Sequence, residues 1–212
     1  PVDATFLCDH RFDHLLDDIS ADARTKWLEY SRAELVKLEE NFTNAELSED
    51  KHIDYQIFRD DLIRSIWLAE NTHPFEQDPR TYGTYINDSV YSLLTQSTLA
   101  KEKNVANAIS RIREIPRIVA SARTTLADPP KSVLQTGILQ NRGAIGFYEK
   151  GIFDLVGGTP QLAELRVACG QAVMALKEHQ AFLENDLLPK ASDNWRLGRE
   201  KFSRKLELVL DV

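Results

Sequence analysis

Residues 8–14 gather several side chains of metal-ligating type in one short stretch. His10 and His14 stand four residues apart in the segment HRFDH, a spacing by which two histidines on one helix turn bind zinc in zincins. In that motif the second position is a glutamate that serves as general base, whereas here it is Arg11. Cys8 and Asp13 are of the right chemical type to complete a ligand set.

The same segment has a second interpretation, which we favour. It shows no helical pattern of apolar residues, so nothing places His10 and His14 on one face. We therefore expect residues 1–19 to form an extended arm that hydrogen bonds and ion pairs hold in place. A metal-binding domain centred on Cys8, His10 and His14 is the alternative. It predicts a stoichiometric metal that is lost when both histidines are replaced by alanine.

Adjacent carboxylates recur along the chain and raise the possibility of paired-carboxylate catalysis. These pairs are Asp17–Asp18, Glu39–Glu40 and Asp60–Asp61. Neighbours on a helix point about 100° apart, so they do not converge on one substrate atom, and solvated faces are the better interpretation. No serine or cysteine stands in a nucleophile context. We interpret the aromatic residues Trp67, Tyr82, Tyr85, Tyr91 and Tyr148 as core and rim packing. We therefore assign no catalytic, cofactor-binding or metal-binding residue to this chain.

The composition is that of a folded protein with an acidic balance. Hydrophobic residues make up 42% of the 212 residues and charged residues 28%. The net charge of -7 argues against nucleic acid as the main partner, because neutralising phosphates requires a basic face. Two basic regions are interpreted as solvated helix faces; the alternative is a basic wall that faces an acidic ligand or another domain. Their members are Lys101, Lys103, Arg111, Arg113, Arg117, Arg123, Arg196, Arg199, Lys201, Arg204 and Lys205.

Cysteine content and hydropathy leave the compartment open. Cys8 and Cys169 do not form a disulfide framework, and Cys169 fits a small core position. No apolar run is long enough to cross a membrane, and no signal peptide is visible. Because the chain starts at Pro1 rather than at methionine, we expect that an N-terminal segment has been removed. Both a cytoplasmic and an exported location agree with these features.

A long helix over residues 159–189 is the expected centre of the fold. Thr159 can cap it, Pro160 fits its first position, and Pro189 ends it. Apolar residues recur at helical spacing: Leu162, Leu165, Cys169, Ala172 or Val173, Leu176, Leu183 and Leu187. Other helices must cover this stripe. The sequence therefore predicts an all-α fold, a multi-helix bundle of antiparallel helices around this central helix.

We expect a single helical domain over residues 1–212. After the arm, residues 20–71 form a hairpin of two helices that begin after Ser20 and Ser48, with Asn44 in the turn. The residues expected to face inward there are Trp27, Leu28, Leu35, Leu38, Phe42, Ile53, Ile57, Phe58, Leu62, Ile66 and Ala69. Residues 72–99 hold a short helix at about 86–94 and a long loop, 72–84, which is a candidate for function.

Residues 100–212 are expected to form the main bundle. A helix over about 101–126 should kink or split near Pro116. In the next helix, over about 131–153, Gly137, Gly143 and Gly146 indicate close approach to a neighbouring helix. The last amphipathic helix runs to Val212 and has no capping residue, so we expect the natural polypeptide to continue.

Three stretches together resemble one protein family. They are ATFLCDHRFDHLLDDIS at the start, REIPRIVASARTTLADPPKSV in the middle and FLENDLLPKASDNWRLGREKFSRKLELVL near the end. By their order and spacing, essentially all 212 residues resemble the bacterial family called domain of unknown function 885. One local departure is Cys8, where the family pattern leads us to expect glycine.

The resemblance implies a longer, largely helical protein similar to zinc metallopeptidases of the gluzincin type, with a deep cleft between two halves. The zinc segment of such proteins, of the type His-Glu-x-x-x-x-His, does not occur in this chain, so zinc is expected only in a downstream part. The resemblance therefore implies a non-catalytic N-terminal portion that forms a wall or lid of the substrate cleft. Its partners would be the rest of its own polypeptide and a peptide substrate.

The residues by themselves leave another possibility open. A self-contained helical module that binds a ligand or a protein, without enzymatic activity, has the same composition and helix pattern. In either case we expect no membrane span. If the chain is part of a longer protein, we also expect exposed apolar surface where the missing part docks, through which the chain self-associates.

Overall fold

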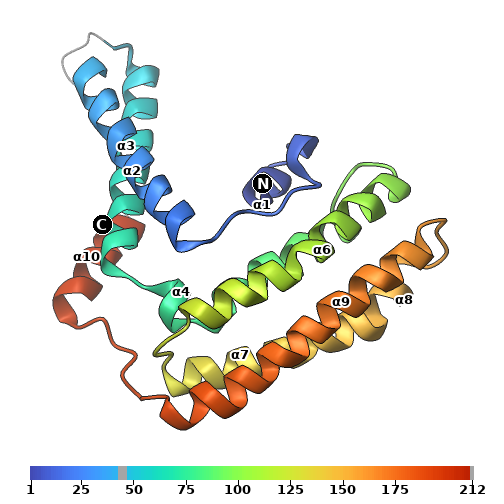
Figure 1. Cartoon of the computed structure of the whole chain (residues 1–212). Helices are drawn as coiled ribbons and strands as arrows, with labels where there is room; N and C mark the ends of the chain where they lie inside the picture. Colours follow the sequence, from blue (N-terminus) through green and yellow to red (C-terminus); the bar gives the residue numbers. More distant parts are fainter. Residues whose placement is uncertain (43–46, 211–212) are drawn as a thin grey trace. The chain divides into compact units, whose positions relative to one another are not determined.

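The computed structural model describes residues 1–42 and 47–210. Its α-helices are α1 (Val2–Phe6), α2 (Ala21–Phe42), α3 (Glu49–Asn71), α4 (Pro74–Gln77), α5 (Ser89–Thr95), α6 (Lys101–Thr125), α7 (Lys131–Gly146), α8 (Ile152–Val156), α9 (Leu162–Ala181) and α10 (Arg199–Leu210). Three 3₁₀ turns, η1 (His10–Phe12), η2 (Pro79–Tyr82) and η6 (Leu188–Lys190), and three π-helical turns, η3 (Thr84–Asp88), η4 (Phe147–Gly151) and η5 (Phe182–Leu187), complete it. The described residues contain no strand, so the predicted all-α class is confirmed (Figure 1). The predicted turn residue Asn44 lies outside the described residues, as does Val212.

Contacts group the chain into two compact units, each built from two separate stretches. Unit 1 comprises Pro1–Asp18 and Pro74–Asn194, and unit 2 comprises Ile19–His73 and Trp195–Val212. The last helix therefore differs from expectation: α10 packs on α3 of the hairpin rather than joining the main bundle of residues 100–194. The segment 191–198, which contains no helix, separates α10 from the main bundle in the sequence.

Unit 1 is organised around α6, α7 and α9. Helices α6 and α9 run side by side in the same direction, as the ion pairs Arg113–Glu164 and Arg123–Glu178 require (Figure 1). Helix α7 packs against α9 in the opposite direction. The amide of Asn141 marks this contact, since it donates to the Leu176 carbonyl at 3.0 Å. Helices α6 and α9 are thus parallel to each other, and α7 is antiparallel to α9.

The predicted central helix is present, but both of its ends differ. Pro160 and Gln161 form a turn, and the helix begins only at Leu162. At the other end the α-helix widens into the π-helical turn η5 and then the 3₁₀ turn η6. The predicted stripe is buried at Leu165, Cys169, Ala172, Val173, Leu176, Leu183 and Leu187, and His179 joins it.

Helix α6 continues unbroken through Pro116, so the predicted split is wrong. Proline removes one intrahelical hydrogen bond and disfavours the helix locally. Burial on both sides outweighs this cost here, because Ile112, Ile115 and Ile118 are all fully buried in the unit 1 core. Packing on both sides of the proline therefore keeps the helix continuous, and the predicted kink stays a prediction.

Unit 2 has a small core. Ser20 caps α2 as predicted, since its hydroxyl accepts the Ala23 N–H at 3.2 Å. Of the residues expected to face inward, only Leu62 is buried, whereas Trp27, Phe42, Ile53, Ile57 and Phe58 are exposed. Two helices cover one face of each other, and among the described residues the main contact of α10 is with α3. The rest of both apolar stripes is left uncovered.

Candidate functional site

The N-terminal segment is a short helix followed by a 3₁₀ turn, so the expectation of an extended arm is corrected. Asp9 caps the turn by accepting the Arg11 N–H at 3.2 Å, and its carboxylate pairs with the Arg11 guanidinium. These contacts hold the Asp9 pKa at about 2, below its usual value. His10 Nδ1 lies 2.8 Å from the buried carboxylate of Asp13. Arg11 and His10 therefore each have an acidic partner at the two ends of the turn, Asp9 and Asp13.

A buried arginine of α6 holds this segment against unit 1. Arg111 donates to the hydroxyl of Thr5 at 2.6 Å and to the carbonyls of Leu15 and Ser89 at 2.9 and 2.8 Å. The Thr5 hydroxyl in turn donates to Asp13 at 2.7 Å. Burial lowers the Arg111 pKa, while the negative charge of Asp13 opposes that shift. The predicted network of hydrogen bonds and ion pairs is thus present.

The ligand set of the metal alternative does not come together. His10 has Asp13 on one ring nitrogen and Thr98, at 3.3 Å, on the other. His14 lies beyond the 3₁₀ turn, so it does not share a helix face with His10. Cys8 is exposed. Within residues 1–42 and 47–210 no three His, Cys, Asp or Glu side chains are grouped to hold a metal ion.

The acidic pairs have separate structural partners instead of a shared focus. Asp17 pairs with the Pro1 ammonium group at 3.0 Å. Glu39 pairs with Arg59 on the neighbouring helix at 2.9 Å. Asp61 pairs with Arg64 one turn along α3. None of these contacts has the geometry of a paired-carboxylate site.

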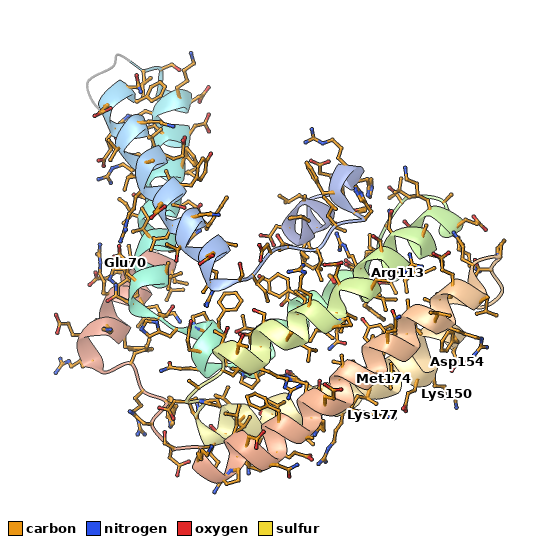
Figure 2. All side chains as sticks on the ribbon, viewed as in Figure 1. Glu70, Arg113, Lys150, Asp154, Met174 and Lys177 are labelled. Atoms are coloured by element: carbon orange, nitrogen blue, oxygen red, sulfur yellow. The ribbon has the colours of Figure 1, made fainter. Side chains whose placement is uncertain are left out.

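The first basic region does not form a continuous wall. Arg113 extends from α6 and pairs with Glu164 of α9 at 2.7 Å (Figure 2). Arg123 pairs with Glu178 at 3.1 Å, and Arg117 pairs with Glu114 at 2.7 Å. Arg111 is buried, as described above. The charges of α6 therefore serve helix packing and the N-terminal segment.

A pocket in unit 1 is the best candidate for a functional site. It has a volume of about 370 Å³ and lies between two walls. One wall comes from the segment η2–η3–α5, which includes part of the predicted functional loop 72–84, and the other comes from α7 and η4. Its lining residues are Arg80, Gly83, Thr84, Asn87, Asp88, Tyr91, Gln140, Gly143, Ala144 and Phe147.

Two π-helical turns shape this pocket. The turn η3 contributes Thr84, Asn87 and Asp88, and η4 contributes Phe147. Inserting a residue into a helix widens it and redirects the side chains, and such turns are frequent at functional sites. The hydroxyl of Tyr148 in η4 donates to the carbonyl of Ile86 in η3. This buried bond fixes the two turns to each other.

The pocket combines charged, polar and aromatic groups. Partial exclusion of water raises the Asp88 pKa above its ordinary value. Arg80 donates from Nε and Nη2 to Asp78, at 2.9 and 2.7 Å, so its charge is compensated outside the lining. Tyr91 and Phe147 meet edge to face, with ring centroids 6.2 Å apart. This set suits recognition of a ligand, and it includes no nucleophile with an adjacent base.

A second hollow lies on unit 2. It has a volume of about 620 Å³ and is lined by Glu39, Tyr55, Gln56, Arg59 and Asp60. Arg59 pairs with Glu39 at 2.9 Å and approaches Asp60 at 3.6 Å. The two carboxylates therefore share one guanidinium, which leaves Arg59 engaged on both sides.

Sequence reasoning assigned no residue to the pocket of unit 1. The sequence points toward this pocket only through the length of the segment 72–84, part of which lines it. Tyr91 was interpreted as packing, yet it is 51% exposed and lines the pocket. The sequence holds no sign of the π-helical turns, because their extra residue is not marked by any composition or spacing.

The geometry defines an all-α protein with a pocket lined by charged, polar and aromatic residues and, among its described residues, no assembled catalytic centre. Comparison with family models matches residues 1–212 to "Bacterial protein of unknown function (DUF885)". The chain belongs to this family, as its three stretches indicated. A comparison with curated proteins found no match.

A solved structure has a similar fold. It is described as "a putative lipoprotein of unknown function" from Shewanella oneidensis, with a TM-score of 0.85 and 21% sequence identity. The alignment covers 98% of this chain and 39% of that one. The chain therefore spans well under half the length of this structural neighbour. In the part of this chain that the structure describes, no helix has the length and hydropathy of a membrane-spanning segment.

Proposed function

We propose that this chain is the non-catalytic helical portion of a larger zinc-dependent peptidase, in which it forms a wall of the substrate cleft. The observation that carries the proposal is the pocket of unit 1, which has groups for recognition but no assembled groups for hydrolysis. Alignment with 39% of a longer protein supports a role as part of a larger whole. The zinc-dependent chemistry rests on the resemblance stated from the sequence.

In such a peptidase a zinc-bound water is the nucleophile and a glutamate is the base. The described residues of this chain offer no cluster that could hold the zinc ion. Their contribution would be to bind and orient the substrate in unit 1. Positioning of this kind lowers the barrier because it converts a bimolecular encounter into an oriented complex.

The test compares two polypeptides. One is the present chain, and the other is the product of the whole reading frame that encodes it. We expect the longer product to bind one zinc ion and to cleave members of a mixed peptide library, and the present chain to do neither. Metal analysis and mass spectrometry of the products provide the readouts. Peptide cleavage by the present chain, or a longer product without zinc, would overturn the proposal.

A second candidate is a self-contained helical binding module without enzymatic activity. The favouring observation is that every lining residue of the pocket belongs to unit 1. This candidate predicts that the reading frame ends at Val212 and that the present chain binds its ligand without any further polypeptide. The same two polypeptides therefore separate the two candidates.

A further inference from the structure

The pocket of unit 1 carries a carboxylate without a cationic partner. Among the described residues no cation pairs with Asp88, whereas the guanidinium of Arg80 is already held by Asp78. Asp88 is exposed at the mouth of the pocket, and the partial loss of water there raises its pKa because it disfavours the charged carboxylate. A cation that enters the pocket would supply the missing countercharge. The uncompensated charge of the pocket is therefore negative.

A second acceptor stands next to this carboxylate. The side-chain oxygen Oδ1 of Asn87 is buried and receives no hydrogen bond from the described residues. A buried acceptor without a donor costs about 1–3 kcal/mol, so a donor from a ligand is favoured there. The last torsion of asparagine is broad, which lets the amide turn its oxygen toward the pocket. Asn87 and Asp88 both line the pocket, so a ligand with several N–H donors and a positive charge would meet them at separate points of its wall.

Aromatic rings complete this environment. Tyr91 and Phe147 line the pocket and contact each other edge to face. Aromatic faces attract organic cations, and their edges and faces also pack against an apolar body. Gly83 and Gly143 keep the space open, because a Cβ atom at either glycine would meet no atom within 4 Å.

We propose that this pocket binds a primary ammonium group attached to an aromatic or apolar body. Asp88 supplies the countercharge, Asn87 accepts a hydrogen bond, and Tyr91 with Phe147 surrounds the body. The inference deepens the proposed function and rests on it only for the source of the amine, which would be the N-terminus of a peptide. A free amine presents the same chemistry.

An anion is the less suitable ligand. Arg80 is the basic residue of the lining, and it would have to give up a two-pronged contact with Asp78 to receive one. Asp88 would also repel an anion at short range. The arrangement of charges therefore selects against a carboxylate or a phosphate.

The binding test uses the present chain and three probes of similar size. Calorimetric titration compares phenethylamine, its neutral N-acetyl derivative and 3-phenylpropionate. We expect phenethylamine to bind at least 10-fold more tightly than the other two. A second pair, the peptide Phe-Gly-Gly and its N-acetyl form, tests the source. We expect the free N-terminus to bind and the acetylated one to bind at least 10-fold more weakly.

Variants connect binding to the pocket. We expect Asp88→Asn to weaken phenethylamine binding at least 10-fold. Gly143→Leu should abolish binding because its side chain fills the pocket. Gly146→Leu is the matched control, since it lies on the same helix, its Cβ also meets no atom within 4 Å, and it does not line the pocket. Circular dichroism confirms that each variant is folded.

Three results would overturn the inference. The first is an affinity for 3-phenylpropionate that equals or exceeds the affinity for phenethylamine and that the Arg80→Gln variant loses. The second is equal binding by the Gly143→Leu and Gly146→Leu variants. The third, binding of phenethylamine but not of Phe-Gly-Gly, would overturn the peptide source. Loss of peptidase activity from the longer polypeptide would bear on the proposed function alone, because these titrations require no catalysis.

Discussion

At the residue scale, Cys8 adopts a backbone conformation that suits glycine. Its φ angle is +62°, in the left-handed region where a Cβ atom approaches the following carbonyl. Among the described residues it is the non-glycine residue with a positive φ. The family pattern led us to expect glycine at this position, and the backbone gives the physical reason. The chain tolerates cysteine here because the Thr5–Asp13–Arg111 contacts fix the segment on both sides.

We predict that Cys8→Gly stabilises the protein by about 0.5–1 kcal/mol. The left-handed strain costs about 1–2 kcal/mol, and the extra freedom of glycine in the unfolded chain offsets part of its relief. Urea unfolding monitored by circular dichroism measures the change. Cys8→Ala is the control and should give no such gain, because alanine retains the Cβ atom. Equal stabilisation by both variants would contradict this explanation.

His179 is a buried titratable residue that the sequence did not single out. It is 2% exposed, stacks on Phe182 and has no hydrogen-bond partner at Nδ1 among the described residues. Burial, with repulsion from Arg123, lowers its pKa from 6.5 to about 4. The imidazole is therefore neutral in the folded protein at pH 7.

This shift predicts a loss of stability in mild acid. The unfolded state binds a proton as the pH falls below 6.5, whereas the folded state does so only near pH 4, so protonation favours unfolding across this window. We expect His179 to contribute a loss of about 2 kcal/mol between pH 7 and pH 5. Urea unfolding at both pH values should show a smaller loss in His179→Gln. The exposed His73→Gln serves as control, and an unchanged loss in His179→Gln would refute the assignment.

At the scale of elements, a single glycine sets the distance between α7 and η2. A Cβ atom at Gly137 would lie 2.5 Å from Cγ of Pro79, which is too close. The proline ring is rigid, so the contact cannot be relieved by a rotamer change. The glycines of α7 predicted a close backbone approach to a neighbouring helix; at Gly137 the close neighbour is instead the ring of Pro79 in the 3₁₀ turn η2. Gly143 and Gly146 do not share it, since their Cβ atoms would meet nothing within 4 Å.

We predict opposite effects for alanine at two of these positions. Gly137→Ala should destabilise the protein by about 1–3 kcal/mol, because η2 must move away from α7. Gly146→Ala should stabilise it by up to about 1 kcal/mol through the higher helix propensity of alanine. Thermal unfolding of the two variants, measured together, gives the comparison. A stabilising Gly137→Ala would show that the two elements do not pack as described.

Local patterns predicted most of the helices, because their signals lie within a few residues of each other. Helix α3 has the predicted bounds, and the buried stripe of α9 follows the predicted spacing. Pro116 misled because packing from both sides, a tertiary effect, outweighed a local rule. The pocket could not be predicted, since the turns η3 and η4, about 60 residues apart in the chain, come together by tertiary contacts such as the Tyr148–Ile86 hydrogen bond.

At the scale of the whole molecule, unit 2 exposes an unusual amount of apolar side chain. Its exposed large apolar residues among those described are Trp27, Tyr30, Val36, Phe42, Ile53, Ile57, Phe58, Trp195, Phe202, Leu206, Val209 and Leu210. Exposed apolar surface of this extent is typical of interaction sites. It supports the expectation that the chain contacts either further polypeptide or a second copy of itself.

We predict that the chain self-associates through unit 2. Sedimentation velocity should show a species larger than the monomer at micromolar concentrations. The double variant Trp27→Glu/Ile57→Glu should shift it toward monomer, because burying a charge in an apolar interface is costly. The control is Met174→Glu in unit 1; Met174 lies on α9 and is labelled in Figure 2. Its side chain is 63% exposed, close to the 66% of Trp27 and the 65% of Ile57. An unchanged distribution in the double variant would argue against unit 2 as the interface.

The buried Arg111 has a consequence for how the protein is made. Its partner Thr5 lies 106 residues earlier in the chain, so residues 1–18 must wait for α6 to be synthesised before they can dock. At about 5–20 residues per second this delay lasts several seconds, during which the apolar side of the segment is available to chaperones. Unit 2 likewise closes only when residues 195–212 emerge. Neither unit can be released intact by one proteolytic cut, because each is assembled from two distant pieces of a single polypeptide.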